Sequence, residues 1–309
     1  MKITALAGGI GASKFLLGLA SVLPPEDITI IANTGDDIEL FGLRVCPDID
    51  TVTYTLGGVI NPVTGWGLHD DTFECLQGLK RYGEDIWFNL GDRDLATHIF
   101  RTHNLRQGVS LSEVTDSIRR AFGVKSTILP MTDAYTPTRI KTDNGEMHLQ
   151  EYFVRRRCEP RVVDVSFDNI EHAKPAAGVK NAILDADLVI LCPSNPFISI
   201  GPILAVPGIR EMLCETEATV IAITPIIGGK AMKGPAADML RDLGYEVSAG
   251  AVAKIYRDFL DVFVLDEVDA ELQAEIKANG SRVITTNTVM NTAEEKAALA
   301  RKVVEAASR

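Results

Sequence analysis

The first residues suited to phosphate chemistry form a glycine-rich loop, Gly8-Gly9-Ile10-Gly11-Ala12-Ser13-Lys14, which follows an apolar run and opens a helical pattern. Glycines let the backbone approach an anion, and free N–H groups at a helix start favour negative charge. The dinucleotide fingerprint would need a glycine at Lys14, and the P-loop would need one at Ser13, so neither template fits. The loop is predicted to hold an anion. The alternative is a tight strand-to-helix turn.

Four aspartates follow the next apolar run in two closely spaced groups. They lie in Asn33-Thr34-Gly35-Asp36-Asp37 and in Pro47-Asp48-Ile49-Asp50-Thr51. Clustered carboxylates near a phosphate-binding loop suit magnesium, which prefers oxygen ligands and usually shares itself with substrate phosphates. We expect at least one of the four to bind a metal or to act in catalysis. The alternative is that Asp36 and Asp48 only cap helices or turns.

Two later loops also follow apolar runs. The first is Cys192-Pro193-Ser194-Asn195-Pro196, in which two prolines stiffen the chain around a hydroxyl and an amide suited to phosphate or base edges. Its alternative is a rigid turn in which Asn195 bonds only its own backbone. The second is Ile227-Gly228-Gly229-Lys230 with Lys233 nearby. These lysines could offset phosphate charge, or they could be solvated surface groups beside a turn.

Two further segments could recognise a polar, planar ligand. Asn89-Leu90-Gly91-Asp92-Arg93-Asp94 mixes an amide, acids and an arginine, so it either contacts a ligand or caps the next helix. Trp66 stands between two glycines, and an aromatic side chain in such a loop is a plausible stacking face for a planar ring. The sequence shows no nucleophile motif and no metal-ligand spacing of histidines, which favours direct transfer.

The elements that must position these loops are short apolar runs with helical patterns between them. Strands are expected at Ile3–Ala7, Ile28–Ala32, Ile86–Leu90, Leu188–Cys192, Thr219–Ile223 and Val262–Leu265. Several are continuously apolar, as in a parallel sheet covered on both faces. Helices are expected at Ser13–Val22, Asp70–Tyr82, Asp94–Asn104, Leu111–Phe122 and Gly208–Cys214, and a capping box of Thr292 and Glu295 should open a last helix running towards Ser308.

This alternation predicts an α/β fold with a Rossmann-like, doubly wound, mostly parallel sheet. The middle of the chain adds helices and a hairpin over Ile140–Val154 that turns at Asp143-Asn144-Gly145. We predict a single unit over residues 1–309, with a core from about 1–60 and 181–309 and an inserted helical and β-hairpin subdomain at about 61–180. Ligands of such sheets bind beyond the carboxyl ends of the strands, where the loops described above should lie.

Composition narrows the function classes. The formal net charge is −11, which excludes most nucleic-acid binders because these need a basic surface. No apolar run approaches the roughly 18 residues of a membrane span, and the N-terminus predicts no signal peptide, so we expect a cytoplasmic protein. The five cysteines lie far apart, which argues against a disulfide framework or a zinc site. A diphosphate bound by this acidic chain needs local compensation from N–H groups, lysines or a divalent cation.

Seven segments, in family order over nearly the whole chain, resemble the 2-phospho-L-lactate transferases. This family attaches phospholactate to the deazaflavin Fo (7,8-didemethyl-8-hydroxy-5-deazariboflavin) during synthesis of coenzyme F(420). The segments are LAGGIGASKFLLGL, NTGDDIELFGLRVCPDIDTVTYTLGG, GWGL, WFNLGDRDLATHIFRT, LPMTD, PSNPFISIGPIL and PIIGGKAMKGPAA. Each alone is weak, but their joint occurrence is specific.

The resemblance implies a Rossmann-like core with an added subdomain, magnesium dependence and a homodimer. The implied donor is lactyl-2-diphospho-5′-guanosine, the acceptor is the terminal ribityl hydroxyl of Fo, and the products are GMP and coenzyme F(420)-0. The donor would meet Gly8, Gly9, Gly11, Ser13, Lys14, Ser194, Asn195 and Pro196, with Lys230 a further candidate for its phosphates. Fo would meet Asp50 and Asn89, with Trp66, Asp92 and Arg93 nearby.

Within this framework we expect Asp50, with Asp36 or Asp37, to hold the metal and to orient or deprotonate the acceptor hydroxyl. Three alternatives stay open. The donor could carry phosphoenolpyruvate in place of phospholactate, since both occur among relatives. The chain could belong to a sister family of nucleotide-sugar-binding regulators, although GWGL and NLGDRD favour the transferase. A nicotinamide-dependent dehydrogenase is disfavoured by the broken fingerprint.

Overall fold

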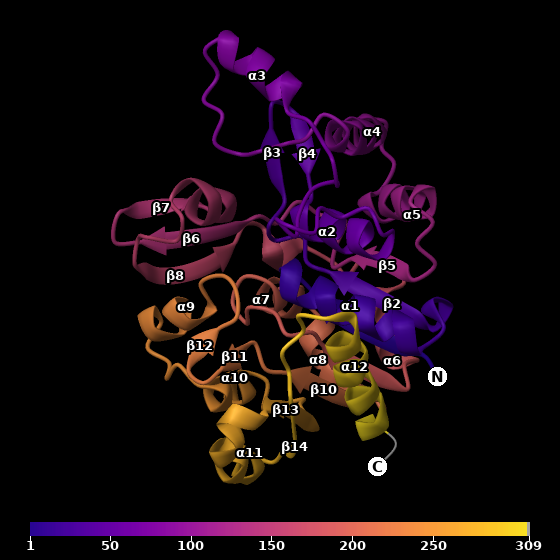
Figure 1. Ribbon diagram of the computed structural model, residues 1–309, viewed down its shortest axis with the longest axis vertical. Helices are drawn as coiled ribbons and strands as arrows, with labels where there is room; N and C mark the ends of the chain where they lie inside the picture. The colour runs from indigo at the N-terminus through magenta and orange to yellow at the C-terminus, as the bar shows by residue number, and fades with distance from the viewer. Residues whose placement is uncertain (308–309) are drawn as a thin grey trace.

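The central feature of the computed structural model, which describes residues 1–307, is a sheet of seven strands (Figure 1). The strands are β1 (Ile3–Ala7), β2 (Ile28–Ala32), β5 (Thr127–Pro130), β9 (Leu188–Leu191), β10 (Thr219–Ile223), β13 (Val262–Asp266) and β14 (Arg282–Thr286). Their order is β14-β13-β10-β9-β1-β2-β5, and every pairing is parallel. The first strand lies inside the sheet and the chain winds outwards from it in both directions. The predicted Rossmann-like, doubly wound class is confirmed.

Alternate residues of each central strand pack on opposite faces of the sheet. In β1, Ile3 and Ala5 face one hydrophobic cluster and Leu6 faces the other. The first face is covered by α1 (Gly9–Val22), α2 (Pro47–Leu56), α5 (Leu111–Ala121) and α12 (Ala293–Ala307). The second is covered by α6 (Val179–Leu184), α7 (Ile200–Ala205), α8 (Ile209–Glu215), α9 (Ala236–Asp242), α10 (Ala249–Ile255) and α11 (Gln273–Ala278). Burial on both faces explains why the central strands are mostly apolar, as in β9, whose four residues are all apolar.

Two insertions depart from the central sheet. Between β2 and β5 the chain forms a hairpin of β3 (Ile38–Leu40) and β4 (Leu43–Val45), then α2, α3 (Glu74–Arg81), α4 (Asp94–Arg106) and α5. The hairpin and α3 project at the top of Figure 1. Between β5 and β9 it forms an antiparallel sheet of β6 (Thr138–Thr142), β7 (Gly145–His148) and β8 (Val162–Phe167). A short hairpin of β11 (Ile226–Ile227) and β12 (Lys230–Ala231) follows β10.

Short helical turns complete the fold. Three are 3-10 helices, at Pro25–Asp27, Ile170–His172 and Glu267–Leu272, and one is a π-helix at Glu151–Arg155. None of the helices described for residues 1–307 combines the length and the apolar character that crossing a bilayer requires.

Several predicted elements differ from the structure. The segment Ile86–Leu90 is not a strand, because Trp87, Phe88 and Leu90 pack in a small cluster with the β3–β4 hairpin and α3, away from the sheet. The segment predicted as an insertion, residues 61–180, contains β5, which pairs with β2 at the edge of the central sheet. The core strand β5 therefore lies between two insertions in the chain. The strand β14 was not predicted.

The sequence motifs that mark helix starts and turns predicted the structure better than the apolar runs did. The capping box is confirmed, since the Glu295 N–H donates to Thr292 Oγ1 and the Thr292 N–H donates to Glu295 Oε2. The predicted end of that helix at Ser308 lies outside the described residues. The hairpin does turn at Asp143-Asn144-Gly145, but it ends at His148, and the chain then enters the π-helix.

Candidate active site

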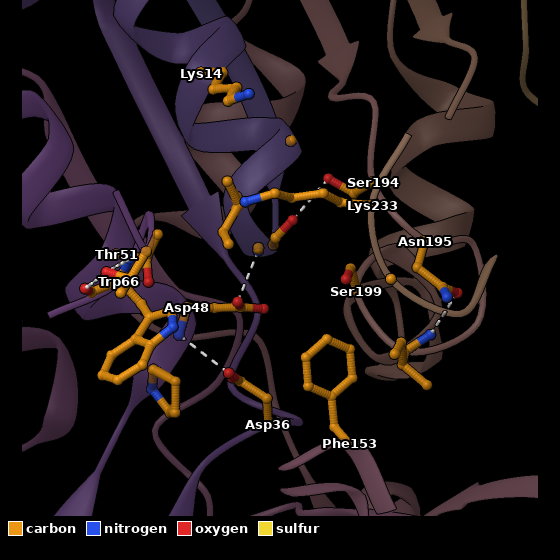
Figure 2. Close-up of a pocket in the computed structure, with 18 of the residues that line it drawn as sticks. Lys14, Asp36, Asp48, Thr51, Trp66, Phe153, Ser194, Asn195, Ser199 and Lys233 are labelled. Atoms are coloured by element: carbon orange, nitrogen blue, oxygen red, sulfur yellow. Dashed lines mark hydrogen bonds between the residues drawn. The ribbon is translucent and has the colours of Figure 1, made fainter. Parts of the chain in front are cut away.

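One large cavity lies beyond the carboxyl ends of the central strands (Figure 2). Its volume of about 650 Å³ is within the range of small-molecule sites. In Figure 2, Trp66 and Thr51 lie on one side, Ser194 and Asn195 lie on the other, and Asp48 lies between them. The predicted residues that line it are Gly8, Gly9, Gly11, Lys14, Asp36, Asp50, Trp66, Asn89, Ser194 and Asn195. Loops distant in the chain therefore meet at one site.

The glycine loop between β1 and α1 is shaped by close packing. Gly9 has a φ of 75°, in the left-handed region that glycine adopts without strain. A Cβ on Gly8 would lie 2.8 Å from Asp48 Oδ2, and a Cβ on Gly11 would lie 2.4 Å from the carbonyl oxygen of Pro193. The Gly9 N–H donates to Asp48 Oδ1 over 2.7 Å, so this donor is already paired within the protein. Turn geometry and packing alone require these glycines.

The loop after β9 is tied to the glycine loop. Ser194 Oγ donates to the carbonyl oxygen of Gly8 at 2.8 Å. Asn195 Oδ1 accepts from the backbone N–H groups of Phe197 and Ile198, at 2.8 and 3.3 Å. For Asn195 this is the self-bonded turn named above as the alternative. Both side chains nevertheless line the cavity, so the loop forms a rigid wall with its backbone geometry fixed from within.

Asp36 and Asp48 form a buried carboxylate pair at the floor of the cavity. Asp36 Oδ2 accepts from the Asp48 N–H at 3.1 Å, and Asp36 Oδ1 has no hydrogen-bond partner among residues 1–307. Burial, and next repulsion from Asp48, raise the pKa of Asp36 well above its usual value. Burial raises the pKa of Asp48 to about 6, although hydrogen bonds from Asn33 and Gly9 oppose the shift. Such a pair is stabilised by a proton or by a cation.

Asp50, in α2, lines the same cavity and is paired with a buried arginine. The guanidinium of Arg101, on α4, donates to both carboxylate oxygens of Asp50, with Nη1 3.1 Å from Oδ2. Burial, the largest single influence, lowers the pKa of Arg101, but attraction to Asp50, Cys46 and Tyr54 together with the hydrogen bond to Asp50 makes the net shift upwards. The charge of Asp50 is therefore balanced within the protein.

Of the residues that the sequence predicts to contact the acceptor, some line the cavity and others lie outside it. Trp66 lines the cavity with 40% of its surface exposed, and Gly65 and Gly67 on either side have φ values of 77° and 70°. Asn89 also lines the cavity. Asp92 lies outside it, because its carboxylate accepts from the first N–H groups of α3, those of Glu74 and Cys75. Asp92 therefore caps a helix, but it is the preceding helix α3 and not the next helix, which the sequence alternative had named.

Five further predicted residues lie outside the cavity. Asp37 points away from Asp36, and its Oδ2 accepts from Cys46 Sγ at 3.0 Å and lies 3.7 Å from Arg44 Nη1. Burial raises the pKa of Asp37 to about 7 against attraction to Arg44. The other four are engaged elsewhere or face solvent. Ser13 donates to the Ile10 carbonyl within α1, Arg93 donates to the His69 carbonyl, Pro196 is buried beneath its loop, and Lys230 is exposed on β12.

Lys233 takes the place predicted for Lys230. It lines the cavity beside Ser194 in Figure 2, while Lys14 lies further along α1. Burial, followed by repulsion from Lys233 and Lys296, lowers the pKa of Lys14. Two lysines thus bring positive charge to a cavity that four aspartates, Asp36, Asp48, Asp50 and Asp94, also line.

Several lining residues were not predicted. His98 lines the cavity and Arg101 lies buried behind it, on one face of α4 with Asp94; their i, i+4, i+7 spacing is a signal that an amphipathic analysis could have used. Phe153, on the π-helix, and the segment 288–291 after β14 also line the cavity. For these two the sequence gives no comparable signal, since their places depend on how the insertion and the last strand pack.

A doubly wound parallel sheet with one large cleft beyond its strand ends defines a Rossmann-like α/β protein. Solved structures agree. A UPF0052-family protein of Bacillus halodurans, 17% identical, superposes with a TM-score of 0.65 and covers 98% of both chains. At this identity the likeness shows the fold alone.

Residues 3–307 match the family described as 2-phospho-L-lactate transferase CofD. The phosphoenolpyruvate transferase of Streptomyces griseus is 45% identical, covering 99% of this chain and 98% of its own. The 2-phospho-L-lactate transferase of Methanocaldococcus jannaschii is 40% identical, covering 98% and 97%. The chain therefore belongs to the 2-phospho-L-lactate transferase CofD family, and the predicted resemblance is confirmed. Membership supports a transferase activity in coenzyme F(420) synthesis.

Proposed function

We propose that the protein transfers the 2-phospholactyl group of lactyl-2-diphospho-5′-guanosine to the terminal ribityl hydroxyl of Fo, forming coenzyme F(420)-0. The observation that carries the proposal is that one cavity brings Ser194 and the glycine loop together with Asp50, Asn89 and Trp66. Family membership supports the same reaction. A two-substrate transfer needs both ligands in one cleft, because proximity and orientation supply much of the rate enhancement.

The donor belongs on the side formed by the loops after β1, β9, β10 and β14. Lys14 and Lys233 offer positive charge there, and the N-terminus of α1 opens towards the cavity. Fo belongs on the opposite side, where the half-exposed Trp66 offers a stacking face and Asn89 offers an amide. This division follows the chain, since Asp50, Trp66 and Asn89 all belong to the insertion between β2 and β5.

The reaction is an in-line displacement at phosphorus. The ribityl oxygen of Fo attacks the phosphorus that carries the lactyl group, and the bond from that phosphorus to the bridging oxygen breaks. GMP leaves with the bridging oxygen and its electron pair. Asp50, held by Arg101, orients the hydroxyl and accepts its proton. Positioning and charge neutralisation are the main demands of such a transfer, so no covalent intermediate is required.

Magnesium fits the carboxylates of the cavity. Asp36 and Asp48 are the residues that would hold it, because Asp36 Oδ1 is buried without a partner in the described part of the chain, and both pKa values are raised. Asp50 is engaged by Arg101 and Asp37 points elsewhere. Magnesium usually takes one or two protein carboxylates plus substrate phosphates, so two aspartates would suffice. When bound, the ion would neutralise diphosphate charge.

A phosphoenolpyruvyl donor is the second candidate. The relatives named phosphoenolpyruvate transferase are 44–46% identical to this chain, against 38–40% for those named 2-phospho-L-lactate transferase. Phospholactate and phosphoenolpyruvate differ by two hydrogen atoms. An apolar pocket discriminates between such similar substrates by a difference in transition-state binding free energy of only about 1–3 kcal/mol. Both donors are therefore expected to react to some extent, and their relative rates decide the physiological one.

The test is one incubation of Fo, magnesium and each guanosine donor, with the products identified by mass. Asp50→Asn should lower turnover at least about a hundredfold, the scale of a lost acid–base group. A variant that keeps near-normal turnover would remove Asp50 from the mechanism, and a wild-type enzyme inactive with both donors would refute the proposed reaction. The homodimer and the cytoplasmic location stay predictions, which light scattering and cell fractionation would check.

A further inference from the structure

Arg101 is the largest side chain that is fully buried in the described structure, with 0% of its surface exposed. Its guanidinium lies behind Asp50, and Nη1 and Nη2 each donate to a different carboxylate oxygen. Nη1 also lies 3.4 Å from the carbonyl oxygen of Arg44. A two-pronged contact of this kind fixes the plane of a carboxylate as well as its charge, which a lysine cannot do.

Beside Arg101 and Asp50 lies a chain of polar groups, with His98 and Asp94 on the same face of α4 and Tyr54 on α2. His98 Nδ1 is 3.2 Å from Arg101 Nη1. A guanidinium can only donate, so Nδ1 must accept, and the ring proton lies on Nε2. Nε2 lies 3.4 Å from Asp94 Oδ1 without a hydrogen bond in the described part of the chain, and Asp94 Oδ1 accepts from the Tyr54 hydroxyl at 2.6 Å. His98 Nδ1 is also 3.7 Å from Asp50 Oδ2, so the imidazole packs beside the Arg101–Asp50 pair and helps to hold the guanidinium in place.

The same contacts exclude His98 as the base of the reaction. Its Nδ1 is occupied by the arginine, and its Nε2 faces Asp94. The carboxylate of Asp50 lines the cavity on the side proposed for the acceptor. Because a carboxylate oxygen has more than one lone pair, Asp50 can accept from Arg101 and still accept from a ligand hydroxyl.

A buried ion pair is weak evidence for stability, since well-packed apolar residues often stabilise a core equally well. The cost of burying Arg101 therefore calls for another role. We propose that Arg101 is a positioning residue for the transfer, which acts through Asp50 by fixing the carboxylate that receives the acceptor hydroxyl. This inference rests on the proposed reaction with Fo. It adds a specific requirement, namely that the two-pronged contact, and not only a positive charge, sets the turnover rate.

Arg101→Lys tests this requirement because it keeps the charge and removes the fork. We expect kcat to fall at least about tenfold, while KM for the guanosine donor stays within about twofold, since the donor side is untouched. The matched control is Arg119→Lys. Arg119 is a largely buried arginine of α5, paired with Asp116 and outside the cavity, so its variant should keep the wild-type kcat. Melting temperatures show whether each variant is folded.

A double-mutant cycle separates positioning from a structural role. If Arg101 acts through Asp50, Asp50→Asn/Arg101→Lys should turn over at the rate of Asp50→Asn alone. If the lysine variant does not fold, Asp50→Asn/Arg101→Gln, whose buried pair is uncharged, tests the same equality. A further loss of kcat in either double variant, or a wild-type kcat for Arg101→Lys, would overturn the inference. An inactive wild-type enzyme would instead overturn the reaction itself, and with it this role.

Discussion

Gly11→Ala tests whether the packing of the glycine loop on the loop after β9 shapes the donor side. Gly11 lines the cavity, and an alanine Cβ there would lie 2.4 Å from the carbonyl oxygen of Pro193. Carbon and carbonyl oxygen approach no closer than about 3.3 Å in ordinary contacts. The two loops must therefore separate by about 1 Å. Ser194, whose hydroxyl is bonded to Gly8, would move with them.

The effect on function should exceed the effect on stability. Overpacking of this kind costs about 1–3 kcal/mol, and the gain from replacing a helical glycine with alanine offsets about 0.5–1 kcal/mol. The net loss of stability is therefore about 2.5 kcal/mol at most. A displacement of about 1 Å near reacting groups can lower the rate about a hundredfold. We expect kcat/KM to fall by that order and GDP to bind at least about tenfold more weakly, which corresponds to about 1.4 kcal/mol.

Gly18→Ala is the matched control on the same helix. Its Cβ would lie 2.3 Å from the carbonyl oxygen of Lys296, on α12, so the overlap is similar but falls outside the cavity. Both variants should lower the melting temperature, measured by differential scanning fluorimetry. Only Gly11→Ala should weaken GDP binding, measured by calorimetry, and neither should change Fo binding. Normal GDP affinity in Gly11→Ala, or equal losses in both variants, would refute the reasoning.

Four further outcomes are expected from the same cavity. Trp66→Ala should weaken Fo binding at least about tenfold and spare GDP; unchanged Fo fluorescence titrations would count against stacking. Lys233→Met should weaken GDP binding by calorimetry, while Lys230→Met, on the exposed hairpin, should not. Asp92→Ala should loosen the start of α3, seen as faster proteolysis there, with Fo affinity within about twofold. Removing magnesium with EDTA should weaken binding of the guanosine diphosphate donor but not of Fo; equal loss of both would contradict a role confined to diphosphate charge.

The core of the fold was predictable because a parallel sheet buried on both faces leaves a plain signature. Residues 188–191 are apolar without interruption, residues 3–7 are apolar except for Thr4, and both segments form central strands. The same signature failed at Ile86–Leu90, where apolar side chains fill a small cluster beside the hairpin. It also missed β14, an edge strand whose residues are only partly buried. An apolar segment is expected to be buried, but its local sequence does not show which other part of the protein buries it.

The site was predictable to the extent that strand ends determine it. Glycine and polar loops that directly follow β1, β2 and β9 reach the cavity, as the topology requires. The direction in which each side chain of a loop points was not predictable. Asp36 faces the cavity while its neighbour Asp37 turns to Arg44, and Lys233 replaces Lys230 because the β11–β12 hairpin carries Lys230 outwards. Asp92 illustrates the remaining limit, since a motif can be specific to a family and still serve a helix start.

The charge of the cavity links these observations. Its walls carry Asp36, Asp48, Asp50 and Asp94 against the lysines Lys14 and Lys233. Arg101 balances Asp50 from the interior, so Asp36 and Asp48 remain as the uncompensated pair, directly beneath the glycine loop. A donor phosphate within about 4 Å of one such carboxylate would be repelled by about 4 kcal/mol near a protein surface. The acidic floor therefore disfavours the donor unless a proton or a cation neutralises the pair, and where the pair is ionised diphosphate binding would depend on the metal while the acceptor side stays independent.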